Sequence, residues 1–267
     1  ARERLQSRAP KGAQLADKPA DPIIAQPDVR RMLLTTKALT EGGRLLAAHA
    51  YTQLDTAQHA ADPQARADAE TLVSFLTPIV KACLTEWSIE ATYNGQQVFG
   101  GHGYIAEHGM EQFARDARIT TLYEGTTGIQ ALDLIGRKTA ASQGAGLKLF
   151  AAEIEQFIAD NANNPAVAEF LPVLGAKTRE WGKLTVNVLQ RAASNPEELG
   201  AAAGTTCSTA ATWHWPTGGR AQRPPRRPQA SRKRSSRPSW KPRASTTPAF
   251  CRAHSPMQPA WKAAPIH

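Results

Sequence analysis

Residues 27–60 read PDVRRMLLTTKALTEGGRLLAAHAYTQLDTAQHA, and this stretch sets the fold class. Its apolar side chains recur close to the period of an α-helix, about 3.6 residues, at Val29, Met32, Leu33, Leu45, Leu46 and Ala50. Pro27 and Asp28 favour a helix start, where a missing N–H is tolerated and a negative charge is favourable. The stretch therefore predicts one long helix.

A second long helical segment follows a short turn at residues 61–63. It covers residues 66–101 and reads RADAETLVSFLTPIVKACLTEWSIEATYNGQQVFGG. Two long helices joined by a short link form an antiparallel hairpin. Helical phrases continue over residues 145–200, and no segment alternates apolar and polar residues as an exposed strand does. We predict an all-α fold, a helical bundle with further helices after it.

Charge divides the chain into a body and a tail. The 267 residues carry 32 Lys and Arg against 23 Asp and Glu, a formal net charge of +9. Residues 205–267 hold 12 of the basic residues and no acid, which leaves 20 basic and 23 acidic residues in residues 1–204. The body is mildly acidic, so the overall charge does not predict that it binds nucleic acid.

The tail, residues 205–267, shows no helical period and is rich in Pro and Arg, so we expect it to be disordered. Our preferred interpretation is an out-of-frame translation of GC-rich coding sequence, because such translation yields Arg, Pro, Ala and Ser in excess. The alternatives are a basic arm that binds nucleic acid by neutralising phosphates, and a disordered tail without function.

Cysteines and apolar runs indicate the cellular setting. Cys83, Cys207 and Cys251 show no CxxC spacing, so we interpret them as reduced thiols of a cytoplasmic protein. No apolar run approaches the roughly 18–20 residues of a membrane span, and no signal peptide opens the chain, so we expect no membrane association. The chain starts without Met, inside a charged phrase, ARERLQSR, that we interpret as helical. We therefore expect an excerpt whose true N-terminus lies elsewhere.

Glycines are dense in residues 94–109, NGQQVFGGHGYIAEHG, between two helical segments. They allow positive φ and close approach of the backbone to a ligand, although such a cluster is also typical of a tight corner. His102 and His108 lie within it without other spaced ligands, so we predict no metal site.

Glu124 stands in ITTLYEGTTGIQALDLIGRK, residues 119–138, just before an apolar helix. Thr126 is placed to cap that helix, whose unpaired amides would suit a phosphate or the polar edge of a cofactor. Acids also favour helix N-termini for purely structural reasons. The motif taken alone leaves both interpretations open.

Three phrases, QVFGGHGY, RDARI and YEGTTGIQ, occur in an order and at a spacing that resemble the C-terminal helical domain of the acyl-CoA dehydrogenases. The resemblance runs over residues 1–138. PADPIIAQPDVRRMLLT and GTTGIQALDLIGRK are most similar to a large bacterial branch that includes the 3-methylmercaptopropionyl-CoA dehydrogenases. We expect this domain at residues 1–140, an additional helical region at 141–204, and then the tail.

The resemblance implies a role for each matching position. Glu124 matches the catalytic base, which removes the α-proton of an acyl thioester while a hydride leaves the β-carbon for FAD, and Gly125 matches a residue that lines the thioester site. Positions that match FAD contacts are Arg4, which reaches the FAD of the neighbouring subunit, and Gln97, Gly100, Gly101, Thr126, Thr127 and Gly128. Because the α-proton is weakly acidic, we expect burial against the flavin and the acyl chain to raise the base's proton affinity.

Three departures from the family pattern weaken individual FAD contacts. Gly128 stands where relatives often carry Gln or Asn, and His102 replaces a frequent Asn. The chain around Gln26 lacks the family's usual His-Gln phrase.

The function that the resemblance implies is α,β-dehydrogenation of an acyl-CoA to the trans-2-enoyl-CoA. It implies FAD as cofactor, electron-transfer flavoprotein as acceptor, and a homodimer or homotetramer. We expect the fragment alone to be inactive, because the family's N-terminal helical domain and β-domain supply most of the flavin site. The alternatives are a fragment of an acyl-CoA oxidase, which passes electrons to oxygen, and a non-catalytic helical interaction module with a basic nucleic-acid-binding arm.

Overall fold

A computed structural model describes residues 1–204 of the chain. The predictions made for residues 205–267, namely disorder, a frame error or a nucleic-acid arm, lie outside the described residues, as do Cys207 and Cys251. The remaining cysteine, Cys83, is buried in the core.

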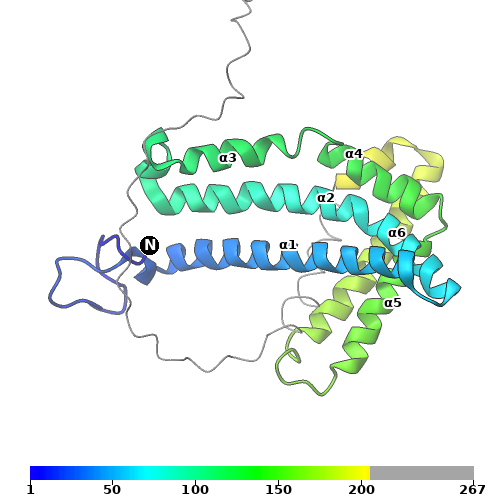
Figure 1. Cartoon of the computed structure of the whole chain (residues 1–267), viewed down its shortest axis with the longest axis horizontal. Coiled ribbons are helices and arrows are strands. Elements are labelled where there is room, and N and C mark those ends of the chain that lie inside the picture. Colours follow the sequence, from blue (N-terminus) through cyan, green and yellow to red (C-terminus); the bar gives the residue numbers. More distant parts are fainter. Residues whose placement is uncertain (205–267) are drawn as a thin grey trace, which may run out of the picture. The chain divides into compact units, whose positions relative to one another are not determined.

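The first two long helices form the predicted antiparallel hairpin (Figure 1). α1 covers Pro27–His59 and α2 covers Pro63–Phe99. Asp62 ends the short link between them and caps α2, since its carboxylate accepts the backbone N–H groups of Gln64 and Ala65. The cap and the proline that follows it explain why the second helix begins where it does.

α1 and α2 approach each other closely at a glycine pair. Gly42 and Gly43 are buried in α1, and a Cβ on Gly43 would lie 2.6 Å from Cδ2 of Leu84 on α2. A side chain there would force its neighbour to move. The letters TEGGR, which interrupt the apolar pattern of the first helix, therefore mark its contact with the second.

After α2 the chain turns back along it. Two short 3-10 segments, η2 (Gly100–Gly103) and η3 (Ala106–His108), form the turn, and η2 begins in the left-handed region at φ +61°. α3 (Met110–Ile119) and α4 (Thr127–Leu132) then contact α2 (Figure 1). The glycine-rich stretch is thus a reversal of the chain at the end of α2.

A π-helical segment, η4 (Asp133–Ala140), continues α4 and leads to two further helices. α5 covers Ala145–Asp160 and α6 covers Leu171–Ser194. α5 contacts both α2 and α6. The helices predicted after the bundle are therefore present and pack onto it.

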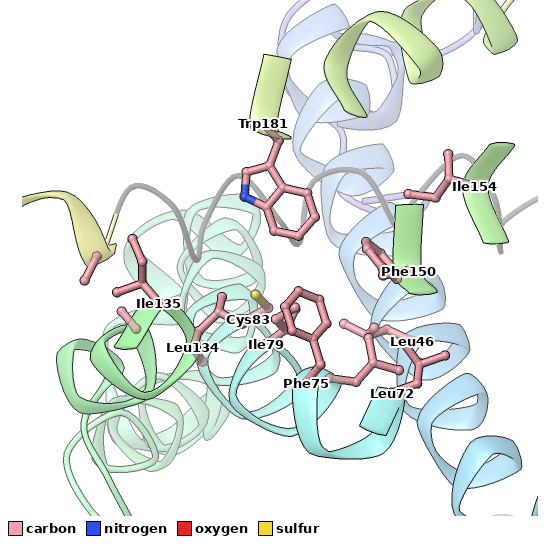
Figure 2. Close-up of a cluster of buried hydrophobic side chains, with 14 of the residues drawn as sticks. Leu46, Leu72, Phe75, Ile79, Cys83, Leu134, Ile135, Phe150, Ile154 and Trp181 are labelled. Carbon is pink, nitrogen blue, oxygen red and sulfur yellow. The ribbon is translucent and has the colours of Figure 1, made fainter. Parts of the chain in front are cut away.

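Three aromatic rings join α2, α5 and α6 into one core (Figure 2). The ring centroid of Phe75 lies 6.0 Å from that of Phe150 and 6.1 Å from that of Trp181, and the last two are 5.9 Å apart. Each of the three residues is at most 2% exposed. A Cβ on Gly146 would lie 2.5 Å from the Cβ of Phe75, so the first turn of α5 depends on a glycine to reach α2. Aliphatic side chains surround the rings, including Leu46, Leu72, Leu76, Ile79, Leu134, Ile135 and Ile154.

The N-terminal loop, residues 1–22, corrects one prediction, because ARERLQSR is not helical there. The carboxylate of Asp21 accepts the backbone N–H groups of Ala9, Gln14 and Leu15, each at 2.8 Å. Side-chain bonds of this kind compete with helical backbone bonds and favour a compact loop. Within the phrase itself, the N–H of Gln6 donates to the carbonyl oxygen of Asp21 and the carbonyl oxygen of Arg4 accepts the N–H of Ile23, each at 2.9 Å. These bonds to distant residues replace the bonds of a helix.

Helices make up all the regular structure of residues 1–204, from η1 (Ile23–Ala25) onward, apart from one isolated bridge between Leu5 and Pro22. The prediction of an all-α fold is confirmed.

Within the described residues, one helical segment, Pro63–Gly103, is long and apolar enough to cross a membrane by length and composition alone. The segment comprises α2 and η2, and Phe75 and Leu76 within it belong to the core. A core helix passes the same test, so the expected lack of membrane association stays a prediction.

Candidate functional site

Glu124 lies on the turn between α3 and α4. Its φ is +54°, in the left-handed region that residues with a Cβ seldom occupy, and Gly125 follows at φ +90°. Glu124 is exposed, and Tyr123 beside it is 46% exposed. The carboxylate is therefore accessible, and the burial that we expected for a base is not provided by residues 1–204.

Two side chains hold this turn in place. Lys81 of α2 donates from Nζ to the carbonyl oxygen of Thr120 at 3.0 Å and to that of Gly125 at 2.6 Å. Gln130 donates from Nε2 to the carbonyl oxygen of Glu124 at 3.3 Å. The backbone on both sides of Glu124 is thus bonded to neighbouring helices.

Gly125 meets a steric requirement in addition to its positive φ. A Cβ at this position would collide with the side-chain amide of Gln130, which bonds the turn. The Gln130 amide occupies the place that a Cβ would take, so it can bond the turn from this position only because residue 125 is glycine.

The start of α4 is capped as predicted. Thr126 accepts the backbone N–H of Ile129 at 3.3 Å, and Thr127 donates its hydroxyl to Oε1 of Glu86 on α2 at 2.7 Å. A Cβ on Gly128 would lie 3.9 Å from Oγ1 of Thr126, which is an ordinary contact. Steric crowding therefore does not explain why glycine stands at position 128, where relatives often carry Gln or Asn.

Four of the predicted cofactor residues line one groove near the other end of α2. The groove has a volume of about 990 Å³ and lies between the N-terminal loop, the start of α1 and the glycine-rich reversal. Arg4, Gln97, Gly100 and Gly101 are among its lining residues. The backbone N–H of Ile23 donates to the carbonyl oxygen of Arg4 at 2.9 Å, which fixes this arginine's backbone beside the groove.

Basic and acidic side chains line the same groove. His102 and His108 lie with their ring centroids 5.0 Å apart, and Glu3 and Asp28 bring carboxylates to it. Within residues 1–204 no three His, Cys, Asp or Glu side chains gather as a metal site would require. The absence of a metal remains a prediction.

Asp21 anchors the loop that forms one wall of the groove. Its side chain is fully buried, and the backbone N–H of Ala9, with those of Leu15 and Gln14, holds its pKa below the ordinary value of 3.8. Burial acts in the opposite direction, while Arg8, whose Nη1 lies 3.6 Å from Oδ1, helps to lower the pKa. The loop is therefore organised around a carboxylate that stays charged at neutral pH.

The structure does not bring all the predicted site residues together. The turn that carries Glu124 is bonded to Lys81, whereas the groove contains Gln97, sixteen residues further along α2. At the rise of an α-helix this separation is about 24 Å. Glu124, Gly125 and residues 126–128 therefore form one group, and Arg4 with Gln97, Gly100 and Gly101 forms another.

A family model for “Acyl-CoA dehydrogenase, C-terminal domain” matches residues 7–140, about half of the chain. The chain belongs to the acyl-CoA dehydrogenase family. The match contains Glu124 and the glycine-rich reversal, while Arg4 precedes it. It ends before α5, although α5 and α6 share the core of the matched helices.

Two curated relatives support the bacterial branch indicated by the sequence. The chain is 49% identical over 154 residues to 3-methylmercaptopropionyl-CoA dehydrogenase of Ruegeria pomeroyi. This alignment covers 58% of this chain and 26% of that protein. It is 37% identical over 152 residues to butyryl-CoA dehydrogenase of Syntrophomonas wolfei, which covers 57% and 25%. The matches span about a quarter of each of these relatives.

A solved acyl-CoA dehydrogenase relative shares the fold. The structure of Caenorhabditis elegans ACDH-11 in complex with C11-CoA aligns with a TM-score of 0.63 and 19% identity over 74% of this chain and 33% of that chain. At this identity the likeness concerns the fold alone.

Sequence reasoning missed several residues that organise the candidate site. Lys81 and Glu86, which bond to the turn and to the start of α4, lie more than thirty residues before Glu124 in the sequence. The one available signal was Lys81 itself, a single charge inside the apolar phrase TPIVKACL. Gln96 donates to the carbonyl oxygen of Gly103 at 3.2 Å and so stabilises the reversal. Nothing in the sequence distinguished it from its neighbour Gln97.

Proposed function

We propose that this chain is part of a FAD-dependent acyl-CoA dehydrogenase in which Glu124 is the base. The acyl chain would lose its α-proton to the Glu124 carboxylate and its β-hydrogen, as a hydride, to bound FAD. The product is the trans-2-enoyl-CoA. FAD, when bound, would supply the hydride acceptor. This chain would supply the base and hold it in position.

The observation that carries the proposal is the turn at Glu124. An accessible carboxylate with a left-handed backbone stands between two helices, and its own carbonyl and that of the next residue are both hydrogen-bonded. Backbone strain of this kind persists only where surrounding contacts stabilise it, and it is concentrated at functional sites. A residue that merely supplied negative charge to a helix N-terminus would not need this conformation.

Gly125 supports the same role because its missing Cβ lets the Gln130 amide reach the turn and bond the carbonyl oxygen of Glu124. The dry surroundings that strengthen a base would come from the substrate, the flavin and parts of the enzyme beyond residues 1–204.

The groove at the other end of α2 suits a phosphate-bearing cofactor. Its volume of about 990 Å³ is within the range of small-molecule sites, and Arg4 offers planar donors that match phosphate oxygens. Gly100 and Gly101 have open space where a Cβ would stand, as judged among residues 1–204, so a ligand can approach their backbone.

The two groups lie about 24 Å apart along α2, and the arginine that Arg4 matches in the family reaches the FAD of a neighbouring subunit, so the proposed enzyme is an oligomer. Residues 126–128 would contact the flavin that Glu124 serves, while Arg4, Gln97, Gly100 and Gly101 would contact the FAD of a neighbouring subunit. An electron-transfer flavoprotein is the proposed acceptor.

Glu124→Gln in the FAD-loaded enzyme that contains this chain tests the proposal. The amide has nearly the same shape but cannot accept the α-proton, so we expect FAD binding to persist and dehydrogenation to fall by at least about 100-fold. Enoyl-CoA formation with a dye acceptor measures turnover, and hydrogen peroxide formation measures the oxidase alternative. Exchange of α-deuterium with solvent measures proton removal directly.

Glu155→Gln is the matched control, because Glu155 is an exposed glutamate on α5, outside both groups. It should leave turnover unchanged. Turnover of Glu124→Gln close to that of the control would remove Glu124 from the role of base.

A further inference from the structure

Lys81 is placed unusually for a lysine. It lies within α2 between Val80 and the buried Ala82, and it is half-buried itself. Ordering a long flexible side chain costs conformational entropy, so a half-buried lysine needs partners that offset this cost. Its partners are two backbone carbonyl groups of a segment about forty residues away in the sequence.

The two carbonyl groups stand on either side of Glu124. Thr120 precedes it by four residues and Gly125 follows it directly, at 3.0 Å and 2.6 Å from Nζ of Lys81. One ammonium group thus closes the turn at both ends. Bonds from a charged donor are shorter and stronger than neutral ones, so this contact restrains the turn more than a neutral side chain would.

A simpler role for Lys81 would be to stabilise the C-terminal end of α3. Thr120 is the C-cap residue of α3, and a cation near such carbonyl groups is favourable. This role accounts for the longer of the two bonds only. Gly125 is not part of α3, and its carbonyl oxygen is the closer partner.

We propose that Lys81 is a positioning residue for Glu124, acting through the backbone of the turn rather than on the substrate. By holding the carbonyl groups of Thr120 and Gly125, it keeps Glu124 in the left-handed conformation that aims its carboxylate. Glu86, five residues further along α2, accepts the hydroxyl of Thr127 and bonds the same segment to that helix. This inference rests on the proposed role of Glu124 as base.

Lys81→Met in the FAD-loaded enzyme tests the inference, since methionine keeps most of the volume and removes the donor. We expect kcat per bound FAD to fall about 10- to 100-fold, because small misplacements of a reacting group have effects of this size. KM for acyl-CoA and FAD content should change little. With an α-deuterated substrate the isotope effect on kcat should rise, because proton removal becomes slower relative to other steps.

Lys138→Met is the matched control. Lys138 is also half-buried on a helix, and it donates to Oγ of Ser74 at 2.8 Å, away from the turn. It should lower stability to a similar degree without a change in kcat per bound FAD. If Lys81 has a merely structural role, Lys81→Met should give the same result as the control: less FAD-loaded enzyme, with unchanged kcat per bound FAD and an unchanged isotope effect. That result would overturn the proposal.

Amide hydrogen exchange in the chain itself separates this inference from the proposed function. Lys81→Met should speed exchange at residues 120–128 more than Lys138→Met does, whether or not Glu124 is the base. If exchange there is unchanged, Lys81 does not hold the turn and the inference fails. If Glu124→Gln retains turnover while exchange rises as expected, the proposed function fails and the structural restraint stands.

Discussion

At Glu124 the backbone has a conformation that costs a residue with a Cβ roughly 1–2 kcal/mol relative to the right-handed region. Lys81 bonds the carbonyl group of Gly125 and Gln130 bonds that of Glu124 itself, and these bonds offset the cost. Gly125, at φ +90°, lets the chain leave the turn without a second penalty. The position of the candidate base therefore depends on its neighbours' backbone as much as on its own side chain.

Gly125→Ala should destabilise the chain by about 1–2 kcal/mol, because alanine is strained at positive φ. The new Cβ would also displace the amide of Gln130 from the turn. Urea unfolding followed by circular dichroism measures the change.

Gly128→Ala is the comparison in the same segment, because a Cβ there meets only an ordinary contact and lies in a helix. It should be neutral or slightly stabilising. Equal stability of the two variants would show that position 125 does not require glycine.

The N-terminal loop is an element without helix or strand that is held by a single carboxylate. Asp21 accepts three backbone N–H groups, and these bonds keep its pKa below 3.8. A carboxyl group with a lowered pKa in the folded state stabilises that state above its ordinary pKa, and this stabilisation disappears as pH falls through the lowered value. Arg4 and one wall of the groove depend on this loop.

Asp21→Asn should loosen the N-terminal loop at pH 7, since an amide cannot accept all three N–H groups. Hydrogen exchange at Ala9, Gln14 and Leu15 should speed up in the variant. In the parent chain the same amides should lose protection only below about pH 4, whereas the variant should show little further change with acid.

Asp17→Asn is the control for this prediction, because Asp17 is an aspartate of the same loop whose side chain is 75% exposed. Hydrogen exchange at the same three amides should be as slow in this variant as in the parent chain, with the same dependence on pH. Protection that falls at the same pH in Asp21→Asn and in the parent would mean that another group controls the loop.

In the described molecule as a whole, one core extends across the boundary of the family match. The rings of Phe150 and Trp181, from α5 and α6, contact Phe75 of α2 (Figure 2). Helices that share a core unfold together, so the additional helical region should not be separable from the matched domain without loss of stability.

Trp181→Ala should lower the free energy of unfolding by about 3–5 kcal/mol, the usual cost of removing a large buried side chain. Leu184→Ala, at a residue of the same helix that is 50% exposed, should cost much less. Urea unfolding of both variants measures the difference. If the two costs are similar, α6 is not part of the common core.

Much of the fold could be predicted from local pattern. Apolar period, Pro27 with Asp28 and the capping residue Thr126 indicated helices near their observed ends, because caps and burial faces are encoded by neighbouring residues. Pro63, which we placed in the turn, instead begins the second helix behind its cap at Asp62. Density of glycine indicated the reversal after α2. The phrase ARERLQSR was misread as helical because its backbone pairs with residues 21–24, which lie outside the phrase.

The residues of the candidate site could be named from the resemblance of the phrases ARERLQ, QVFGG and YEGTTG to a family, but their grouping in space could not. Only the folded chain separates Glu124 and residues 126–128 from Arg4 and the groove, since that distance is set by the length of α2 between them. The same holds for Lys81, whose partners are distant in sequence and are backbone atoms. Every residue has a backbone carbonyl group, so the sequence does not show which of them a given side chain will bond. Only the packing of the helices decides it.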